Sequence, residues 1–250
     1  MSLAPADPGW HAPRRVNKAR SRTSSPLGGS RGASPTDIPA YTVSEAAALI
    51  GVPVSTLQKW TKGRPYRTKS GIRTSAAIIV TPDPRFLSFT NIVEAHVLAS
   101  LRKERIALEK IRAAVHFVER SLKVKHALAR QEFKTDGVDL FLDQLEVLVN
   151  ASRGGQIGLK VVLQEHLKRV DYDHGRAVRL FPLHRDHAPR AIVIDPRRAF
   201  GRPVLHGTSV PIADISMRFR RGDSIEQLAG DYDVTAAEIE EALRATREAA

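Results

Sequence analysis

Shortly after residue 40 apolar residues recur at the spacing of one helix face, and this pattern predicts a helix over residues 43–50. Thr42 and Glu45 have the spacing of a capping box, in which each side chain satisfies a backbone N–H at the start of a helix. Gly51 is favoured at the position of left-handed backbone that ends a helix. Between these signals the apolar side chains recur every three or four residues, at Val43, Ala46, Ala47 and Ile50.

A second helix is predicted from Pro53 to about Thr61, because proline is favoured at the start of a helix. Leu57 and Trp60 would face inward. Two short helices joined by a glycine-containing turn define a helix-turn-helix. The side chains left on the outside are all polar: Ser55, Thr56, Gln58, Lys59 and Lys62.

Residues 62–90 predict a wing, meaning a β-hairpin beside the helix-turn-helix. Ile78–Val80 favour one strand and Phe86–Phe89 its return, while Gly63 and Gly71 exclude a helix before them. The segment is rich in cations that would lie at the hairpin tip: Lys62, Arg64, Arg67, Lys69 and Arg73.

Two further helices are predicted at residues 89–101 and 107–122. The second carries an apolar stripe from Leu108 to Leu122 with alternating steps of three and four residues. Two heptads favour a packed helix over a free coiled coil. The same stripe is a candidate surface for dimerisation.

Residues 136–183 predict a mixed α+β segment. We expect short strands at Asp139–Leu142 and Glu146–Val149. A turn at Ser152–Gly155 and a helix at Gln156–Leu167 would follow. Apolar alternation on both sides of residues 173–176 predicts a β-hairpin.

The last 60 residues predict a separate unit after a linker at His184–Arg190. A strand at Ala191–Ile194 and a Gly/Pro-rich loop at 201–211 lead to three helices, which begin near Pro211, Ser224 and Thr235. The fold class is therefore α+β and mainly helical. We expect a basic disordered arm at 1–40, a winged helix-turn-helix with its following helices at 41–135, a mixed segment at 136–183, and a trihelical, helix-turn-helix-like domain at 191–250.

Charge distinguishes the two halves of the chain. The whole carries 39 Lys/Arg and 27 Asp/Glu, a net charge of +12. The first 135 residues hold 23 basic against 9 acidic side chains, whereas residues 191–250 hold 8 against 10. A cationic surplus confined to one half favours a polyanion partner there, and double-stranded DNA fits the helix-turn-helix. The absence of cysteine excludes disulfides and is compatible with the cytoplasm.

Catalytic and metal-binding patterns are weak. His184 and His187 are a close pair in a proline-flanked loop, without the helical His-Glu-x-x-His pattern. The glycines at 154–155 lack the Lys-Ser/Thr of a phosphate-binding loop. The spacing of Asp139, Asp143, Asp171 and Asp173 fits strand ends and a turn better than a metal cluster. We therefore expect no enzyme, no catalytic residue, no metal and no cofactor.

Two segments resemble known families. Tyr41–Ala47 followed by Gly51–Leu57 resembles the opening of MerR-type winged helix-turn-helix regulators. The chain departs from that pattern in its second helix, where Ser55, Gln58 and Lys59 replace the usual arginine and paired aromatics. The docking mode carries over with this resemblance, but the base preference does not.

The C-terminal motifs, from Ile194-Asp195-Pro196 to Gly222-Asp223-Ser224, resemble a small trihelical bacterial domain of unknown function that recurs in antitoxins. The order of segments over residues 41–245 is similar to that of the larger VapB-type antitoxins of type II toxin–antitoxin systems. This resemblance implies a PIN-like ribonuclease toxin as partner and repression of the chain's own operon.

These arguments predict two sets of site residues and a homo-oligomer, because bacterial readers usually double their contacts on a two-fold operator. An alternative function is a plain winged-helix regulator that senses a small ligand in its central region. The predicted toxin contacts are Arg202, Arg218, Arg220 and Arg221. Arg202 and His206 are the candidate contacts if the Gly201–Pro211 loop binds a ligand. The predicted DNA contacts are Ser55, Thr56, Gln58 and Lys59 for base edges and Lys62, Arg64, Arg67, Lys69 and Arg73 for phosphates.

Overall fold

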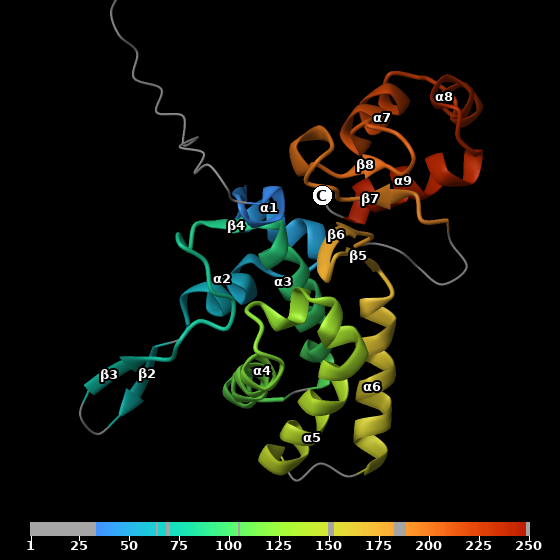
Figure 1. The fold of residues 1–250 in the computed structure, drawn as a ribbon. Helices are drawn as coiled ribbons and strands as arrows, with labels where there is room; N and C mark the ends of the chain where they lie inside the picture. Colours follow the sequence, from blue (N-terminus) through green and yellow to red (C-terminus); the bar gives the residue numbers. More distant parts are fainter. Residues whose placement is uncertain are drawn as a thin grey trace, which may run out of the picture. The chain divides into compact units, whose positions relative to one another are not determined.

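Helices dominate the computed structural model, which describes residues 34–63, 65–68, 71–104, 106–149, 153–182 and 189–248. Helices α1–α9 are interspersed with short strands, and each sheet in the described part of the chain has two antiparallel strands. The predicted class, α+β and mainly helical, is confirmed (Figure 1). Residues 1–33 of the basic arm predicted at 1–40, Arg64, Lys69 and the histidine pair at 184 and 187 lie outside the described residues. The prediction of disorder is wrong for residues 34–40, because Pro35–Asp37 form a 3-10 helix and Pro39–Thr42 form a strand.

The helix-turn-helix forms as predicted. Helix α1 (Val43–Ile50) begins at Thr42, whose side chain accepts a hydrogen bond from the N–H of Glu45 while the Glu45 carboxylate accepts one from the N–H of Thr42. Gly51 ends α1 with φ +68°. Helix α2 (Val54–Lys62) follows, and its Leu57 and Trp60 are buried against the rest of the core.

The wing is present, but its strands differ from the predicted ones. Strands β2 (Pro65–Thr68) and β3 (Gly71–Thr74) pair as a hairpin that projects from the body in Figure 1. The predicted strand at Ile78–Val80 is wrong. Ile78 and Ile79 are buried in an irregular segment, and β4 (Phe86–Ser88) pairs instead with β1 (Pro39–Thr42).

Helix α3 (Phe89–Leu101) is buried on nearly all sides and organises the core. The β1–β4 pair and α1 contact it, and so does α6 (Arg153–Leu167). Helix α4 (Leu108–Leu122) lies against α5 (Val138–Val149), which contacts α6. The apolar stripe of α4 is not available for dimerisation as predicted, because Ile111, Val115 and Val118 are buried inside this core.

The two strands predicted at Asp139–Leu142 and Glu146–Val149 are wrong, since both segments belong to α5. Buried side chains at Val138, Phe141, Leu142 and Leu145 follow the helical steps of three and four residues. A π-helical turn (Phe133–Gly137) leads into α5. Residues 153–155 of the predicted turn are helical and begin α6.

The predicted hairpin is confirmed as β5 (Val170–Asp173) paired with β6 (Arg176–Leu180). One hydrophobic core extends from Tyr41 to Ile194 and includes residues on both sides of position 135. Short 3-10 helices connect elements of this part of the chain at Pro35–Asp37, Arg102–Glu104 and Ala127–Ala129.

The trihelical end has a second core. Strands β7 (Ile192–Val193) and β8 (Val204–Leu205) flank the 3-10 turn η5 (Ala199–Gly201), and α7 (Ile212–Arg220), α8 (Ile225–Tyr232) and α9 (Ala236–Glu248) follow. Capping boxes at Ser224–Gln227 and Thr235–Glu238 open α8 and α9. The Tyr41 hydroxyl donates to the carbonyl oxygen of Gly201 at 3.0 Å and so ties β1 to this unit.

Candidate nucleic-acid interface

The outer face of α2 carries polar side chains, as expected for a helix that reads DNA. Ser55, Gln58, Lys59 and Lys62 are exposed, and Thr56 is half-buried. Leu57 and Trp60 occupy the opposite face and fix the helix to the core. The four exposed side chains are therefore free to contact a groove while α2 keeps its position.

The wing is anchored directly to the C-terminal end of α2. The Trp60 carbonyl oxygen accepts hydrogen bonds from the N–H groups of Ile78 and Ile79 at 2.9 and 3.0 Å. Gly63 leaves the helix with φ +78°, and its Cα faces the returning chain so closely that a Cβ there would lie 1.9 Å from the Ser75 carbonyl oxygen. The wing thus has a defined direction relative to α2.

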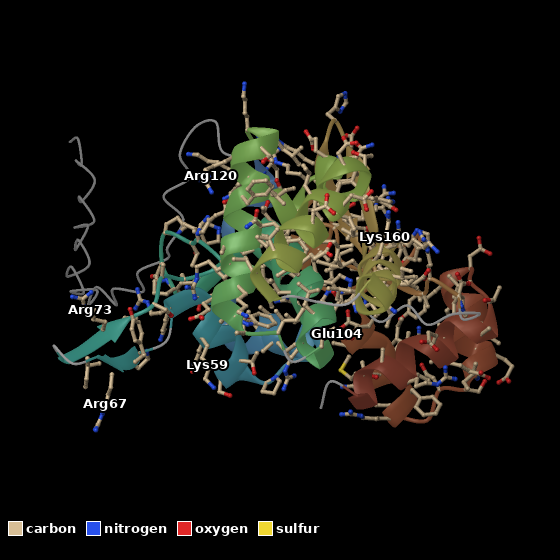
Figure 2. All side chains as sticks on the ribbon, turned by 90° about the horizontal axis from the view of Figure 1, so that it is seen from below. Lys59, Arg67, Arg73, Glu104, Arg120 and Lys160 are labelled. Atoms are coloured by element: carbon tan, nitrogen blue, oxygen red, sulfur yellow. The ribbon has the colours of Figure 1, made fainter. Side chains whose placement is uncertain are left out.

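The two arginines of the hairpin lie on opposite faces. Tyr66 pairs with Arg73, and Arg67 pairs with Ile72, so each directly opposed pair shares one face. Figure 2 shows Arg67 and Arg73 on the projecting hairpin and Lys59 on the adjoining helix. Ile72 is 72% exposed and Tyr66 48%, so each arginine accompanies an apolar side chain open to solvent.

Arg85 lies beside the interface, but an acid neutralises it. The Arg85 guanidinium contacts the Asp83 carboxylate at 2.7 Å. This hydrogen bonding lowers the pKa of the Asp83 carboxyl, and the nearby charge of Lys62 adds to the effect. The Arg85 guanidinium is therefore less available to an anion than an unpaired arginine would be.

The four arginines predicted to contact a toxin are in different states. Arg218 is engaged internally: it contacts Asp223 at 2.6 Å and Asp231 at 2.5 Å, and it stacks on Tyr232. Arg220 and Arg221 are exposed and line a hollow of about 440 Å³ between α7 and α9, together with Met217. Arg202 is exposed after η5.

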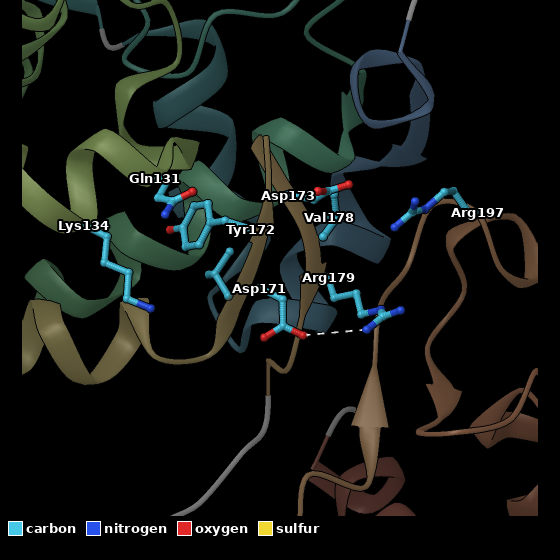
Figure 3. Close-up of a pocket in the computed structure, with 9 residues that line it drawn as sticks. Gln131, Lys134, Asp171, Tyr172, Asp173, Val178, Arg179 and Arg197 are labelled. Carbon is cyan, nitrogen blue, oxygen red and sulfur yellow. Dashed lines mark ion pairs between the residues drawn. The ribbon is translucent and has the colours of Figure 1, made fainter. Parts of the chain in front are cut away.

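A cleft of about 550 Å³ lies beside the β5–β6 hairpin, in the region of the predicted ligand sensor. Figure 3 shows Lys134 on one side of the hairpin and Arg179 and Arg197 on the other. Arg179 and Arg197 both pair with the buried Asp195, at 3.3 and 3.5 Å. The His206 ring packs edge-on against Phe181 at a centroid distance of 5.2 Å.

Within the described residues, no group of three or more His, Asp or Glu side chains is arranged to hold a metal ion. None of the helices in that part of the chain is both long and apolar enough to span a bilayer.

The sequence prediction did not identify Tyr66 and Ile72 as wing residues. A signal for them exists, since Tyr66-Arg67-Thr68 and Ile72-Arg73-Thr74 are strand-favouring triplets. The short polar segment between them is typical of a hairpin turn.

Comparisons with known proteins agree with this layout. Residues 39–115 match the family model described as "Putative DNA-binding HTH domain", and residues 192–244 match that described as "Protein of unknown function (DUF433)". The chain is 29% identical to the "Putative antitoxin VapB45" of Mycobacterium tuberculosis over 84% of this chain and 94% of the relative. It is 26% identical to the uncharacterized protein Rv2308 of the same organism, over 83% and 90%.

The crystal structure of Rv2018 from Mycobacterium tuberculosis is similar in fold, with a TM-score of 0.63 at 26% identity over 83% of this chain and 98% of that one. The chain therefore resembles a VapB-type antitoxin over most of its length, and the resemblance predicted from its motifs is confirmed.

Proposed function

We propose that the chain is a DNA-binding antitoxin, which represses its own operon and neutralises a PIN-like ribonuclease toxin. The likeness to the putative antitoxin VapB45 supports the biological role. The match to a DNA-binding helix-turn-helix model supports the contact with DNA. The observation that carries the DNA half is the wing, whose backbone is anchored to α2 at Trp60.

In this proposal α2 enters the major groove. Gln58 and Lys59 contact base edges together with Ser55 and Thr56, because amide, hydroxyl and ammonium groups match the donors and acceptors displayed there. The cations at 62, 64, 67, 69 and 73 hold phosphates. Since Arg67 and Arg73 lie on opposite faces of the wing, each reaches a different backbone strand. A dimer doubles these contacts on a two-fold operator.

Replacing Arg67 and Arg73 together by alanine will lower the salt dependence of DNA binding. Each lost phosphate contact reduces the slope of log K against log salt by about 0.9, so the slope should fall by about 1.8. The measurement is fluorescence anisotropy of the full chain on a duplex from upstream of its own gene, between low and physiological salt.

Two controls accompany this pair. Arg120→Ala with Lys123→Ala removes the same charge at the end of α4, where both side chains are exposed. It should leave the slope nearly unchanged, since Arg120 lies away from the hairpin in Figure 2 and Lys123 follows the same helix end. Gln58→Ala should weaken binding to the operator more than to a random duplex, with no change of slope. A wing variant with the wild-type slope would show that the hairpin does not contact phosphates.

The toxin half of the proposal depends on arginine chemistry. PIN-like ribonucleases gather carboxylates at their active site, and guanidinium groups pair with carboxylates bidentately. Arg220 and Arg221 are exposed, and no carboxylate of the described residues pairs with them. We therefore assign them to the toxin contact ahead of Arg218, whose donors already serve Asp223 and Asp231.

Co-expression tests the toxin half. The full chain should restore growth to cells that express the PIN-like ribonuclease of the neighbouring gene, and the two proteins should co-purify. Arg220→Glu with Arg221→Glu should weaken the complex by about 10-fold or more, because each charge-assisted hydrogen bond contributes about 1.5–3 kcal/mol. Arg67→Ala with Arg73→Ala is the matched control and should still rescue. Failure of the wild-type chain to rescue or co-purify would exclude the antitoxin role.

The cleft beside β5–β6 supports the second candidate function, a ligand-sensing regulator. It lies where that alternative expects a pocket, and Lys134 and Tyr172 form one of its walls. Its arginines already pair with Asp195, however, and this favours the antitoxin. Operator binding that responds to a small molecule, and no longer responds in a Lys134→Ala variant, would support the sensor.

A further inference from the structure

A phenylalanine stands almost entirely in solvent on the η5 turn of the C-terminal unit. Phe200 is 95% exposed, the most exposed of the large apolar side chains in the described part of the chain. Burying a phenylalanine ring is strongly favourable, so a ring left in solvent offers a partner a large gain in free energy on contact. The turn lies in the orange segment between β7 and β8 in Figure 1.

The backbone that presents this ring is strained. Ala199, Phe200 and Gly201 have consecutive φ angles of +45°, +56° and +77°. Left-handed backbone is unfavourable for residues with a Cβ, so only Gly201 adopts it without cost. Strained residues of this kind persist where the surrounding structure enforces them, and they concentrate at functional sites.

Hydrogen bonds hold the turn from both sides. The N–H groups of Gly201 and Arg202 donate to the carbonyl oxygens of Arg198 and Ala199 at 2.8 and 3.1 Å. The Arg198 guanidinium donates to the Thr208 carbonyl oxygen at 3.0 Å. The Gly201 carbonyl oxygen accepts the Tyr41 hydroxyl, and a Cβ on Gly201 would lie 2.1 Å from that hydroxyl oxygen.

The charges around Phe200 define the partner. Arg197 is paired with the buried Asp195, and the Arg198 head group is hydrogen-bonded to the main chain. Arg202 is exposed, and no carboxylate of the described residues is bonded to it. The surface therefore offers one exposed aromatic ring on an ordered turn and one available guanidinium, and aromatic residues and arginine are both enriched at the cores of protein–protein interfaces.

We propose that Phe200 and Arg202 form a preorganised hot spot that inserts into an apolar, carboxylate-rimmed pocket of a protein partner. This inference rests on the proposed function, under which the partner is the ribonuclease toxin. A protein is favoured over nucleic acid because residues 191–250 carry 8 basic against 10 acidic side chains, which is a poor surface for phosphates. Because the turn is already ordered, binding does not have to order it.

The test measures binding of the full chain to the purified, catalytically inactivated ribonuclease of the neighbouring gene. Phe200→Ala should weaken the complex by about 30-fold, the loss typical of a hot spot, with an unchanged Tm. Phe200→Gly should weaken it equally while raising the Tm by about 2 °C, since glycine tolerates the positive φ. Val147→Ala is the matched control, because Val147 is 76% exposed and lies on α5.

The outcomes separate the two proposals. If the wild-type chain does not bind the ribonuclease, both the proposed antitoxin function and the proposed hot spot are wrong. If the wild-type chain binds and Phe200→Ala binds equally well, the hot spot alone is wrong. A Phe200→Ala variant that keeps toxin affinity but loses affinity for DNA would overturn the choice of a protein partner.

Discussion

Replacing Gly63 by alanine is expected to reduce affinity for operator DNA by about 100-fold or more. The added methyl carbon would lie 1.9 Å from the Ser75 carbonyl oxygen, a distance that real Cβ atoms do not adopt. The neighbouring atoms belong to the backbone, so the conflict cannot be relieved by rotating a side chain. The φ of +78° adds strain for any residue with a Cβ.

Backbone movement is the remaining response, and it would move the wing. Ser75 follows β3 directly, so displacing it turns the β2–β3 hairpin away from α2. Two charge-assisted contacts, from Arg67 and Arg73, would then be lost together. At about 1.5–3 kcal/mol each, their loss accounts for the expected fall in affinity.

Gly71→Ala is the matched control for Gly63→Ala. Gly71 also has a positive φ, +122°, but no atom lies within 4 Å of a Cβ placed there. We expect a modest loss of stability and DNA affinity within a few fold of wild type. Circular dichroism and Tm would establish that both variants fold. A folded Gly63→Ala variant with wild-type affinity would contradict the proposed role of the wing.

Elements with local signals could be predicted from the sequence. Helices α1, α8 and α9 begin at capping boxes, and α1 ends at a left-handed glycine, so their own residues specify their ends. The buried positions Leu57 and Trp60 follow from helical spacing alone. These same features place the polar face of α2, which is why the candidate base contacts could be named before the structure.

The wing could not be placed correctly, because both of its faces are open to solvent. All four residues of β3 are exposed, so its strands carry no buried apolar pattern. The apolar run at Ile78–Val80 misled the prediction, because Ile78 and Ile79 are buried as a loop anchored to Trp60. The segments Asp139–Leu142 and Glu146–Val149 each carry three consecutive apolar residues, and runs this short are compatible with a strand as well as with the helix α5 that they form.

The state of individual arginines also depends on contacts that are distant in sequence. Arg218 is engaged by Asp231, 13 residues later, through the packing of α7 and α8. Phe200 is exposed on a turn whose left-handed backbone is held by hydrogen bonds, one of them from Tyr41. Neither feature has a periodic signal, so sequence reasoning ranked Arg218 with its free neighbours and left Phe200 unremarked.

The wild-type chain is expected to lose about 2 kcal/mol of unfolding free energy between pH 7 and pH 5 through His96 alone. His96 is 2% exposed, and its ring lies 5.1 Å from that of His166, between α3 and α6. Burial lowers the pKa of His96 to about 3, and the charges of His166 and Arg169 add to the effect.

The sign follows from proton uptake. In the unfolded chain His96 takes up a proton near its ordinary pKa of about 6.5, whereas in the folded chain it stays neutral until about pH 3. The unfolded state therefore binds more protons in this window. As the pH is lowered below 6.5, the free energy of unfolding decreases by up to about 1.4 kcal/mol per pH unit. Above pH 6.5 His96 is neutral in both states, so the folded chain keeps this part of its stability in full.

His126 provides a control of opposite sign. Its ring nitrogen lies 3.1 Å from the carboxylate of the buried Glu94, and this hydrogen bond raises the pKa of His126. Its contribution to stability is present below pH 6.5 and is lost as the pH rises through the pKa that His126 has in the folded chain. Removing it should therefore make the acid loss of the chain steeper.

Urea denaturation of the full chain at pH 7, 6 and 5 measures both effects. His96→Gln keeps a hydrogen-bond donor for the His166 carbonyl oxygen, 3.3 Å from the wild-type ring nitrogen, but cannot titrate. It should lower stability at pH 7 and flatten the dependence on pH, whereas His126→Gln should steepen it. His96 is the one titrating group that His96→Gln removes. If this variant is as acid-sensitive as the wild type, a group other than His96 causes the loss of stability.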